Sequence, residues 1–187
     1  MTRTWRRLSR DRRGVAALEL ALVTPVMLIL FFGTVEVTQL IRASNKLNAA
    51  AQAIGNMVAG QKTATSASVQ NAYTGGQLMM APFPNASFAV AVVSVTFDSS
   101  GTASTVGWQV LEGGASSMTT AAACKLVANL GLGSDSVILV RASYNYNAVT
   151  SYILQRGFSL SHIAYGRPRN ISVISGVSST GALTGSC

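Results

Sequence analysis

An apolar stretch near the N-terminus is the feature that most constrains this chain. Residues 20–41 carry a single formal charge, Glu36. As an α-helix they would be about 33 Å long, enough to cross a hydrocarbon core of about 30 Å. A core helix of a soluble protein is the alternative, but such a helix seldom stays apolar around its whole circumference for so long. The sequence therefore predicts one membrane span.

A cleavable secretory signal peptide must also be considered, because it too combines an arginine-rich start with an apolar stretch. The uncharged run, residues 20–35, is slightly long for that class. An Ala-x-Ala pattern occurs only later, at Ala49 and Ala51, within a segment that is expected to be helical. A membrane anchor that stays attached to the chain is the better interpretation.

The positive charge of the chain is concentrated in its first 14 residues. They hold six arginines and Asp11, which gives a net charge of +5 out of +8 for the whole chain. Nucleic acid is therefore not an expected partner, because the rest of the sequence is close to neutral. Arginines beside a span favour the cytoplasmic side, so the N-terminus should be cytoplasmic and the C-terminus should lie outside.

The junction between the arginines and the apolar run carries the most specific motif. Arg13 and Gly14 are followed by small and apolar residues and then by Glu19, five residues after the glycine. This arrangement resembles the cleavage site of class III or type IV prepilins. The whole segment is similar to the N-terminal helix of TadE-like pseudopilins, minor components of the tight-adherence (Flp/Tad) pilus system. The matching positions are Gly14, Ala16, Ala17, Glu19, Pro25, Gly33 and Glu36, and Leu20 departs from the pattern where Phe is usual.

The resemblance implies that a membrane-embedded prepilin peptidase removes the leader, residues 1–14, and leaves Val15 as the mature N-terminus. It also implies contacts of the N-terminal helix with membrane lipid, with other pilin and pseudopilin subunits, and with an inner-membrane pilus assembly platform. The chain would be a single-pass protein of the bacterial inner membrane with a periplasmic C-terminal domain. Incorporation into the extracellular filament and action as an assembly factor both stay open.

Glu19 has a physical role under this interpretation. A carboxylate at the edge of the bilayer core costs a few kcal/mol unless it is paired or protonated. The ammonium group of Val15, from the same or a neighbouring subunit, would neutralise it and favour assembly over the free monomer. The alternative is that Glu19 is solvated at headgroup level. Pro25 removes a backbone hydrogen bond and should kink the helix, whereas Glu36 has no assigned role.

Past the span, apolar residues at three- and four-residue spacing predict that one helix covers residues 15–59, transmembrane first and amphipathic afterwards. Its apolar stripe needs cover, from the chain's own downstream domain or from a partner helix. Residues 60–76, rich in Gly, Ala, Ser and Thr, are expected as a linker that could contain a helical turn around residues 67–73. Residues 77–187 should form one extracytoplasmic α+β domain, with a small antiparallel sheet and a short helix, in a pilin-like architecture.

Within this domain the predicted elements are a hairpin of residues 88–98 and 102–111, a helix within 117–133, and strands at 136–147 and 171–177. Residues 136–147 alternate apolar and polar side chains, which predicts one buried and one wet face. Residues 148–165 are ambiguous.

The chain has two cysteines, Cys124 and Cys187. In an oxidising compartment this even count suits one disulfide that ties down the C-terminal tail, with two free thiols as the alternative. Two cysteines and one histidine make a metal site unexpected, and no cofactor is expected. Arg167 and Arg169 flank Pro168, as in the family that the N-terminal helix resembles. Two interpretations of this segment stay equally open: a solvated turn, or a contact with lipid headgroups or a partner.

Catalysis is not expected from this inventory. Outside the N-terminal helix the acids are Asp98, Glu112 and Asp135, the only histidine is His162, and no catalytic motif is present. A lone histidine is more often structural. The competing interpretation is a signal-anchored periplasmic binding or adhesion domain unrelated to pili.

Overall fold

The computed structural model describes residues 13–148, 157–176 and 185–187. The predicted leader therefore lies outside the described residues, apart from Arg13 and Gly14. Contacts divide the chain into two units, called here the N-terminal unit and the sheet unit. The N-terminal unit is residues 1–40 with 148–156, and the sheet unit is residues 41–147 with 157–187.

The longest element is α2 (Arg13–Ala59), a helix of 47 residues that contributes to both units. It confirms the predicted long N-terminal helix and continues through Pro25. Among the described residues it is the one helix long and apolar enough to cross a membrane. Residues 13–40 of α2 belong to the N-terminal unit, and residues 41–59 belong to the sheet unit.

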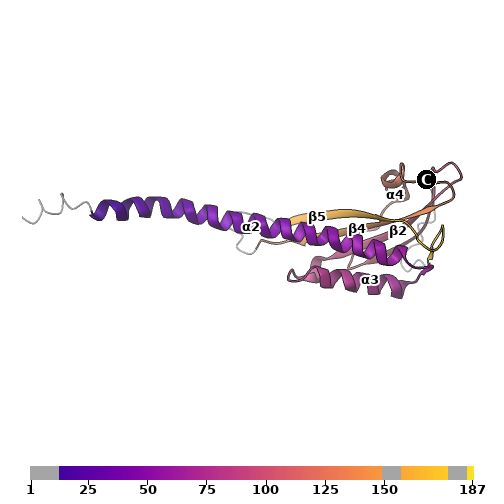
Figure 1. Cartoon of the computed structure of the whole chain (residues 1–187), viewed down its shortest axis with the longest axis horizontal. Coiled ribbons are helices and arrows are strands. Elements are labelled where there is room, and N and C mark those ends of the chain that lie inside the picture. The colour runs from indigo at the N-terminus through magenta and orange to yellow at the C-terminus, as the bar shows by residue number, and fades with distance from the viewer. Residues whose placement is uncertain (1–12, 149–156, 177–184) are drawn as a thin grey trace, which may run out of the picture. The chain divides into compact units, whose positions relative to one another are not determined.

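The sheet unit contains five antiparallel strands in the order β5-β4-β2-β3-β7 (Figure 1). These are β2 (Ala89–Phe97), which follows the 3₁₀ helix η1 (Asn85–Ser87), β3 (Ala103–Glu112), β4 (Ser136–Tyr146), β5 (Phe158–Gly166) and β7 (Gly185–Ser186). β2 and β3 form the predicted hairpin. Its turn is stabilised by Asp98, whose Oδ1 accepts hydrogen bonds from the N–H groups of Ser100 and Thr102. The predicted α+β fold class is confirmed.

Residues 41–59 of α2 pack against one face of the sheet. The apolar side chains on the inner side of this segment, including Leu47 and Ile54, are fully buried, whereas Ile41 and Met57 are exposed. Helix and strand approach so closely that a Cβ built on Gly166 of β5 would lie 2.9 Å from the carbonyl oxygen of Gly55. The chain's own sheet therefore covers the amphipathic stripe for which the sequence left a partner helix as an alternative.

Helix α4 (Thr120–Val127) packs on the opposite face, and Thr119 caps its start by accepting a hydrogen bond from the Ala122 N–H (Figure 1). The cluster buried under it comprises Val93, Val95, Phe97, Val106, Met118, Ala123, Cys124, Val127, Val137 and Leu139. Because α4 covers this side, residues 136–140 of β4 are buried on both faces. The predicted alternation of buried and wet positions holds only from Arg141 onwards.

The segment expected as a linker, residues 60–76, instead contains most of the helix α3 (Ser66–Met79). Thr65 and Ser68 form a capping box, in which each side chain accepts a hydrogen bond from the other residue's N–H. Glycines lower helix propensity, but a Cβ on Gly76 would lie 2.7 Å from a side chain of α2. Close packing on α2 thus outweighs the composition that indicated a linker.

The last predicted strand, residues 171–177, is shorter in the structure than expected. Among its described residues, 171–176, the strand is β6 (Ser175–Gly176), which pairs in parallel with β1 (Thr63–Ala64) outside the main sheet. Strand β5 forms one edge of the main sheet and β7 forms the other, and nearly all of β5 comes from residues 148–165, which were ambiguous in the sequence. Trp108 Nε1 donates a hydrogen bond of 2.8 Å to the Ile174 carbonyl and so holds the segment before β6 against β3.

Candidate processing and assembly segment

The predicted processing site lies at the start of α2. A Cβ built on Gly14 would meet nothing within 4 Å, and Val15 is 51% exposed. Glu19 is also exposed and lies four residues after Val15, the spacing that makes two side chains neighbours on one helix face. Both positions are therefore exposed near the start of α2, and pairing of Glu19 with a new N-terminus at Val15 stays a prediction.

The part of α2 that follows exposes apolar side chains on all sides. Between residues 20 and 35 they are Leu20, Leu22, Val23, Val26, Met27, Leu28, Ile29, Leu30, Phe31, Phe32 and Val35. No charged residue lies among them. So large an apolar surface is unstable in water, whereas the hydrocarbon of a bilayer would solvate it.

Three threonines in the N-terminal unit satisfy their hydroxyl groups within the helix. Thr24, Thr34 and Thr38 donate hydrogen bonds of 2.6, 2.8 and 2.7 Å to the carbonyls four residues earlier. An unpaired polar group in hydrocarbon costs several kcal/mol, so these bonds suit the segment to a bilayer. Pro25 offers no N–H to the Ala21 carbonyl, and the kink expected there stays a prediction.

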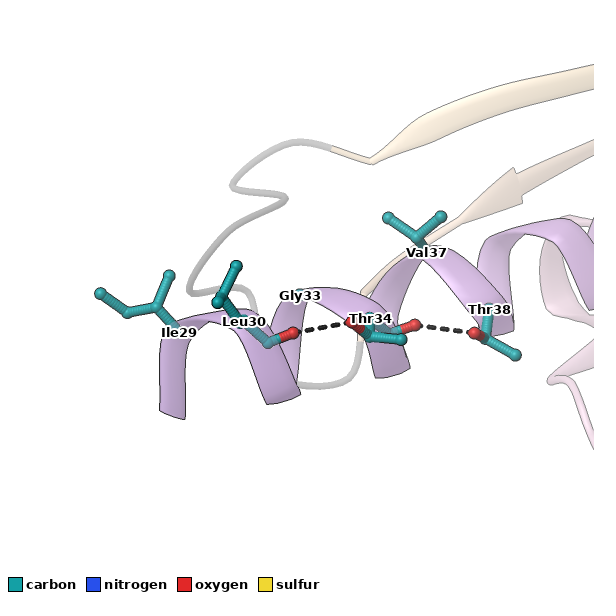
Figure 2. A pocket seen from close by; sticks show the side chains of 6 residues that line it. All are labelled: Ile29, Leu30, Gly33, Thr34, Val37 and Thr38. Atoms are coloured by element: carbon teal, nitrogen blue, oxygen red, sulfur yellow. Dashed lines mark hydrogen bonds between the residues drawn. The ribbon is translucent and has the colours of Figure 1, made fainter. Parts of the chain in front are cut away.

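A shallow depression lies along one side of this helix (Figure 2). Its lining residues are Ile29, Leu30, Gly33, Thr34, Val37 and Thr38. Both threonine hydroxyls are directed along the helix to backbone carbonyls, as the dashed lines in Figure 2 show. The described lining residues offer aliphatic surface and include no acid or base, so this side of the helix suits an apolar side chain or an acyl chain rather than a polar substrate.

Glu36 is buried, with only 2% of its surface exposed. From the sequence it had no assigned role, because a carboxylate near the outer end of a span is readily solvated by water or headgroups. Burial removes that explanation and makes Glu36 a candidate functional residue that sequence reasoning missed. Its place in the family pattern, three residues after Gly33, was the available signal.

The titratable groups of the sheet unit serve its structure. His162 Nε2 lies 2.9 Å from Ser44 Oγ and joins β5 to α2. Hydrogen bonds, first from the Ser100 hydroxyl, lower the pKa of Asp98, and burial raises the pKa of Glu112. Within the described ranges, no three His, Cys, Asp or Glu residues are grouped so that they could hold a metal ion.

Cys124 and Cys187 form the predicted disulfide, with their Cα atoms 5.9 Å apart and a sequence separation of 63. The bond joins α4 to the residue that follows β7. The Cys187 N–H also donates a hydrogen bond of 2.8 Å to the Ser104 carbonyl. The C-terminal residue is therefore attached to the sheet unit both covalently and through the backbone.

The two arginines on either side of Pro168 are engaged within the sheet unit. Arg167 forms a 2.9 Å ion pair with Asp135 and donates a hydrogen bond to the Leu130 carbonyl. Arg169 donates to Asn56 Oδ1 at 3.2 Å. Arg167 connects the end of β5 to the loop after α4, and Arg169 connects the same segment to the end of α2. The two side chains are therefore not simply solvated in a turn.

The comparison with known families concerns the N-terminal helix. A protein-family model described as TadE-like protein matches residues 14–56. This chain carries a TadE-like segment. The match includes Gly14, Glu19, Pro25 and Glu36, and it confirms the resemblance drawn from those positions. No curated protein and no solved structure matches the chain.

Proposed function

We propose that this chain is a minor pseudopilin that takes part in assembling a Tad/Flp (type IVb) pilus. The observation that carries the proposal is the TadE-like match, which begins at Gly14, the predicted point of cleavage. Membership of that family suggests a protein associated with the Tad pilus. The work of the chain is assembly through its N-terminal helix rather than catalysis.

In this proposal a prepilin peptidase cuts the bond between Gly14 and Val15. The open surroundings of Gly14 and the exposure of Val15 support access by the peptidase. Cleavage creates an ammonium group four residues before Glu19. A pair formed with Glu19 of the same or a neighbouring subunit removes two isolated charges from the edge of the bilayer, and the pair between subunits is the one that favours the assembled state.

The proposed location is the bacterial inner membrane, with residues 20–41 as the span and the sheet unit in the periplasm. The exposed apolar surface of α2 and its internally bonded threonines support the span. The Cys124–Cys187 disulfide supports an oxidising compartment for the sheet unit. The arginine-rich leader supports a cytoplasmic N-terminus.

Complementation of cells that lack this chain tests the proposal. We expect wild-type chain to restore surface pili, and Glu19→Gln, which removes the charge but keeps the shape, to restore few. Glu112→Gln makes the same chemical change in the sheet unit and should restore pili fully. Normal piliation without the chain would contradict the proposal, and loss of adhesion alone would favour a membrane-anchored binding domain.

A further inference from the structure

Exposed apolar side chains gather at one end of the sheet unit. Leu78 and Met79 at the end of α3 are 73% and 37% exposed, and Phe158 at the start of β5 is 39% exposed. Phe158 pairs in register with Tyr146, whose ring meets that of Phe83 at a centroid distance of 6.1 Å, four residues after Met79. These side chains therefore come from three neighbouring segments of the unit.

A hydrogen bond places this end close to the point where α2 leaves the predicted span. Lys46 Nζ donates to the Met79 carbonyl oxygen at 3.2 Å. Lys46 follows Ile41, the last residue of the span, by five residues, which is about 7.5 Å along the helix. The headgroup layer on each side of a bilayer core is about 5–8 Å thick. The end of α3 is therefore at headgroup depth whenever Ile41 marks the edge of the hydrocarbon.

We propose that this end of the sheet unit, with Leu78 and Met79 at its centre, is a second membrane-contact surface that rests on the phospholipid headgroups around the span. The inference rests on the membrane anchoring in the proposed function and adds a contact outside the span. Side chains that are apolar and exposed at headgroup depth gain by inserting into the interface.

The charges of the unit agree with a lipid partner. Arg42 is exposed and, with Lys46 one turn later, offers cations to phospholipid phosphates. Asp98 follows the last residue of the nine-residue strand β2, about 30 Å from the strand's start. Burial, and to a smaller extent the charge of Glu112, raises the pKa of Tyr73, six residues before Met79. The charge in direct contact with the end of α3 is the Lys46 ammonium group.

Tryptophan fluorescence in vesicles tests the proposal with the full chain. The background is Trp5→Phe, which leaves Trp108, a residue that is only 3% exposed. Leu78→Trp reports on the proposed surface, and Leu30→Trp reports on the span. Leu132→Trp is the matched control, because Leu132 is 62% exposed and lies in the loop beyond α4 that contacts the Asp98–Gly101 turn.

The vesicles are phosphatidylcholine with phosphatidylglycerol, with and without bromine on the acyl chains. We expect bromine to quench Leu30→Trp and Leu78→Trp and to leave Leu132→Trp unchanged. Quenching at Leu30→Trp without quenching at Leu78→Trp overturns this inference and leaves the membrane anchor intact. The same holds if a second copy of the chain shields the tryptophan at position 78 from lipid, because the surface would then contact protein instead of headgroups. No quenching at either position overturns both.

A charge variant tests the contribution of the cations. Added to Leu78→Trp, Arg42→Gln should reduce the quenching by brominated lipid. Lys62→Gln removes an exposed cation beyond the other end of α2 and should leave the quenching unchanged. Equal quenching in both variants would overturn the assignment of Arg42 to the headgroups.

Discussion

The two parts of α2 share one continuous helical backbone and differ in what surrounds their apolar side chains. Leu30, in the N-terminal unit, is 65% exposed, whereas Leu47 and Ile54, in the sheet unit, are fully buried. The later part is amphipathic and finds its cover within the chain. The earlier part is apolar on all sides, and a bilayer is the solvent that suits it.

The comparison teaches that a single helix, which continues through Pro25, can belong to two environments. In the N-terminal unit, stability should depend on lipid and on other subunits. In the sheet unit, it should depend on packing and on the Cys124–Cys187 bond. Changes that act on one part and leave the other unaffected are therefore the sharpest tests.

The largest expected effect is loss of the disulfide. Replacing Cys124 and Cys187 by serine opens a loop of about 60 residues and should lower the free energy of unfolding of the sheet unit by about 4 kcal/mol. Denaturant titration of the mature chain, followed by Trp108 fluorescence, measures this change. Membrane integration should stay the same, and an unchanged unfolding midpoint would contradict the role given to this bond.

Truncation of the buried stripe should come next. Ile54→Ala removes a fully buried side chain and should cost the sheet unit about 3 kcal/mol. Met57→Ala, three residues later on the same helix, changes a side chain that is 45% exposed and should cost less than about 1 kcal/mol. Equal losses in the same titration would show that the stripe is not covered as described.

A charge in the exposed part of α2 should impair insertion. Leu30→Arg places a guanidinium in the predicted span and should cost about 2.5–3.5 kcal/mol of insertion free energy. Leu132→Arg changes a side chain of nearly equal exposure in the sheet unit and should have no such effect. The fraction resistant to alkaline extraction from membranes measures both, and similar fractions would argue against the span.

The smallest effect is a pH dependence confined to the sheet unit. Hydrogen bonds lower the pKa of Asp98, so their stabilisation is complete above the unfolded pKa of about 3.9 and is lost as pH falls through the folded value. The stability difference between wild type and Asp98→Asn should therefore shrink on acidification.

Glu112 provides a control of opposite sign for this titration. Burial raises its pKa, so its contribution is present at low pH and is lost as pH rises through the folded pKa. Relative to Glu112→Gln, the wild type should therefore become less stable as pH rises. Parallel pH trends for the Asp98 and Glu112 variants in denaturant titrations would contradict these assignments.

Local patterns in the sequence were enough to predict three elements, because each pattern acts over short range. A long apolar run indicated α2, two apolar segments around a turn indicated the β2–β3 hairpin, and a threonine cap indicated the place of α4. Local patterns indicated at most one helical turn where α3 forms, because its glycines lower helix propensity and its stability comes from contact with α2. They also left residues 148–165, which include most of β5, ambiguous, because a half-exposed edge strand has a weak apolar pattern.

The candidate site divides in the same way. Gly14 and Glu19 were found from the resemblance to a prepilin cleavage site, and the family match covers both. Glu36 was missed, because its burial depends on tertiary structure that its neighbours in sequence do not encode. The contacts of Arg167 with Asp135 and Leu130 were missed for the same reason.

The mature N-terminus is the most direct test of the central claim that α2 is a processed pilin-type helix. Intact mass and N-terminal sequencing of the chain from its native membrane should give a first residue of Val15, whereas Gly14→Ala should retain all 14 leader residues and Gly33→Ala should be processed normally. A wild-type chain that begins at Met1 would contradict the account, and a start near Gln52 would show an ordinary signal peptide instead.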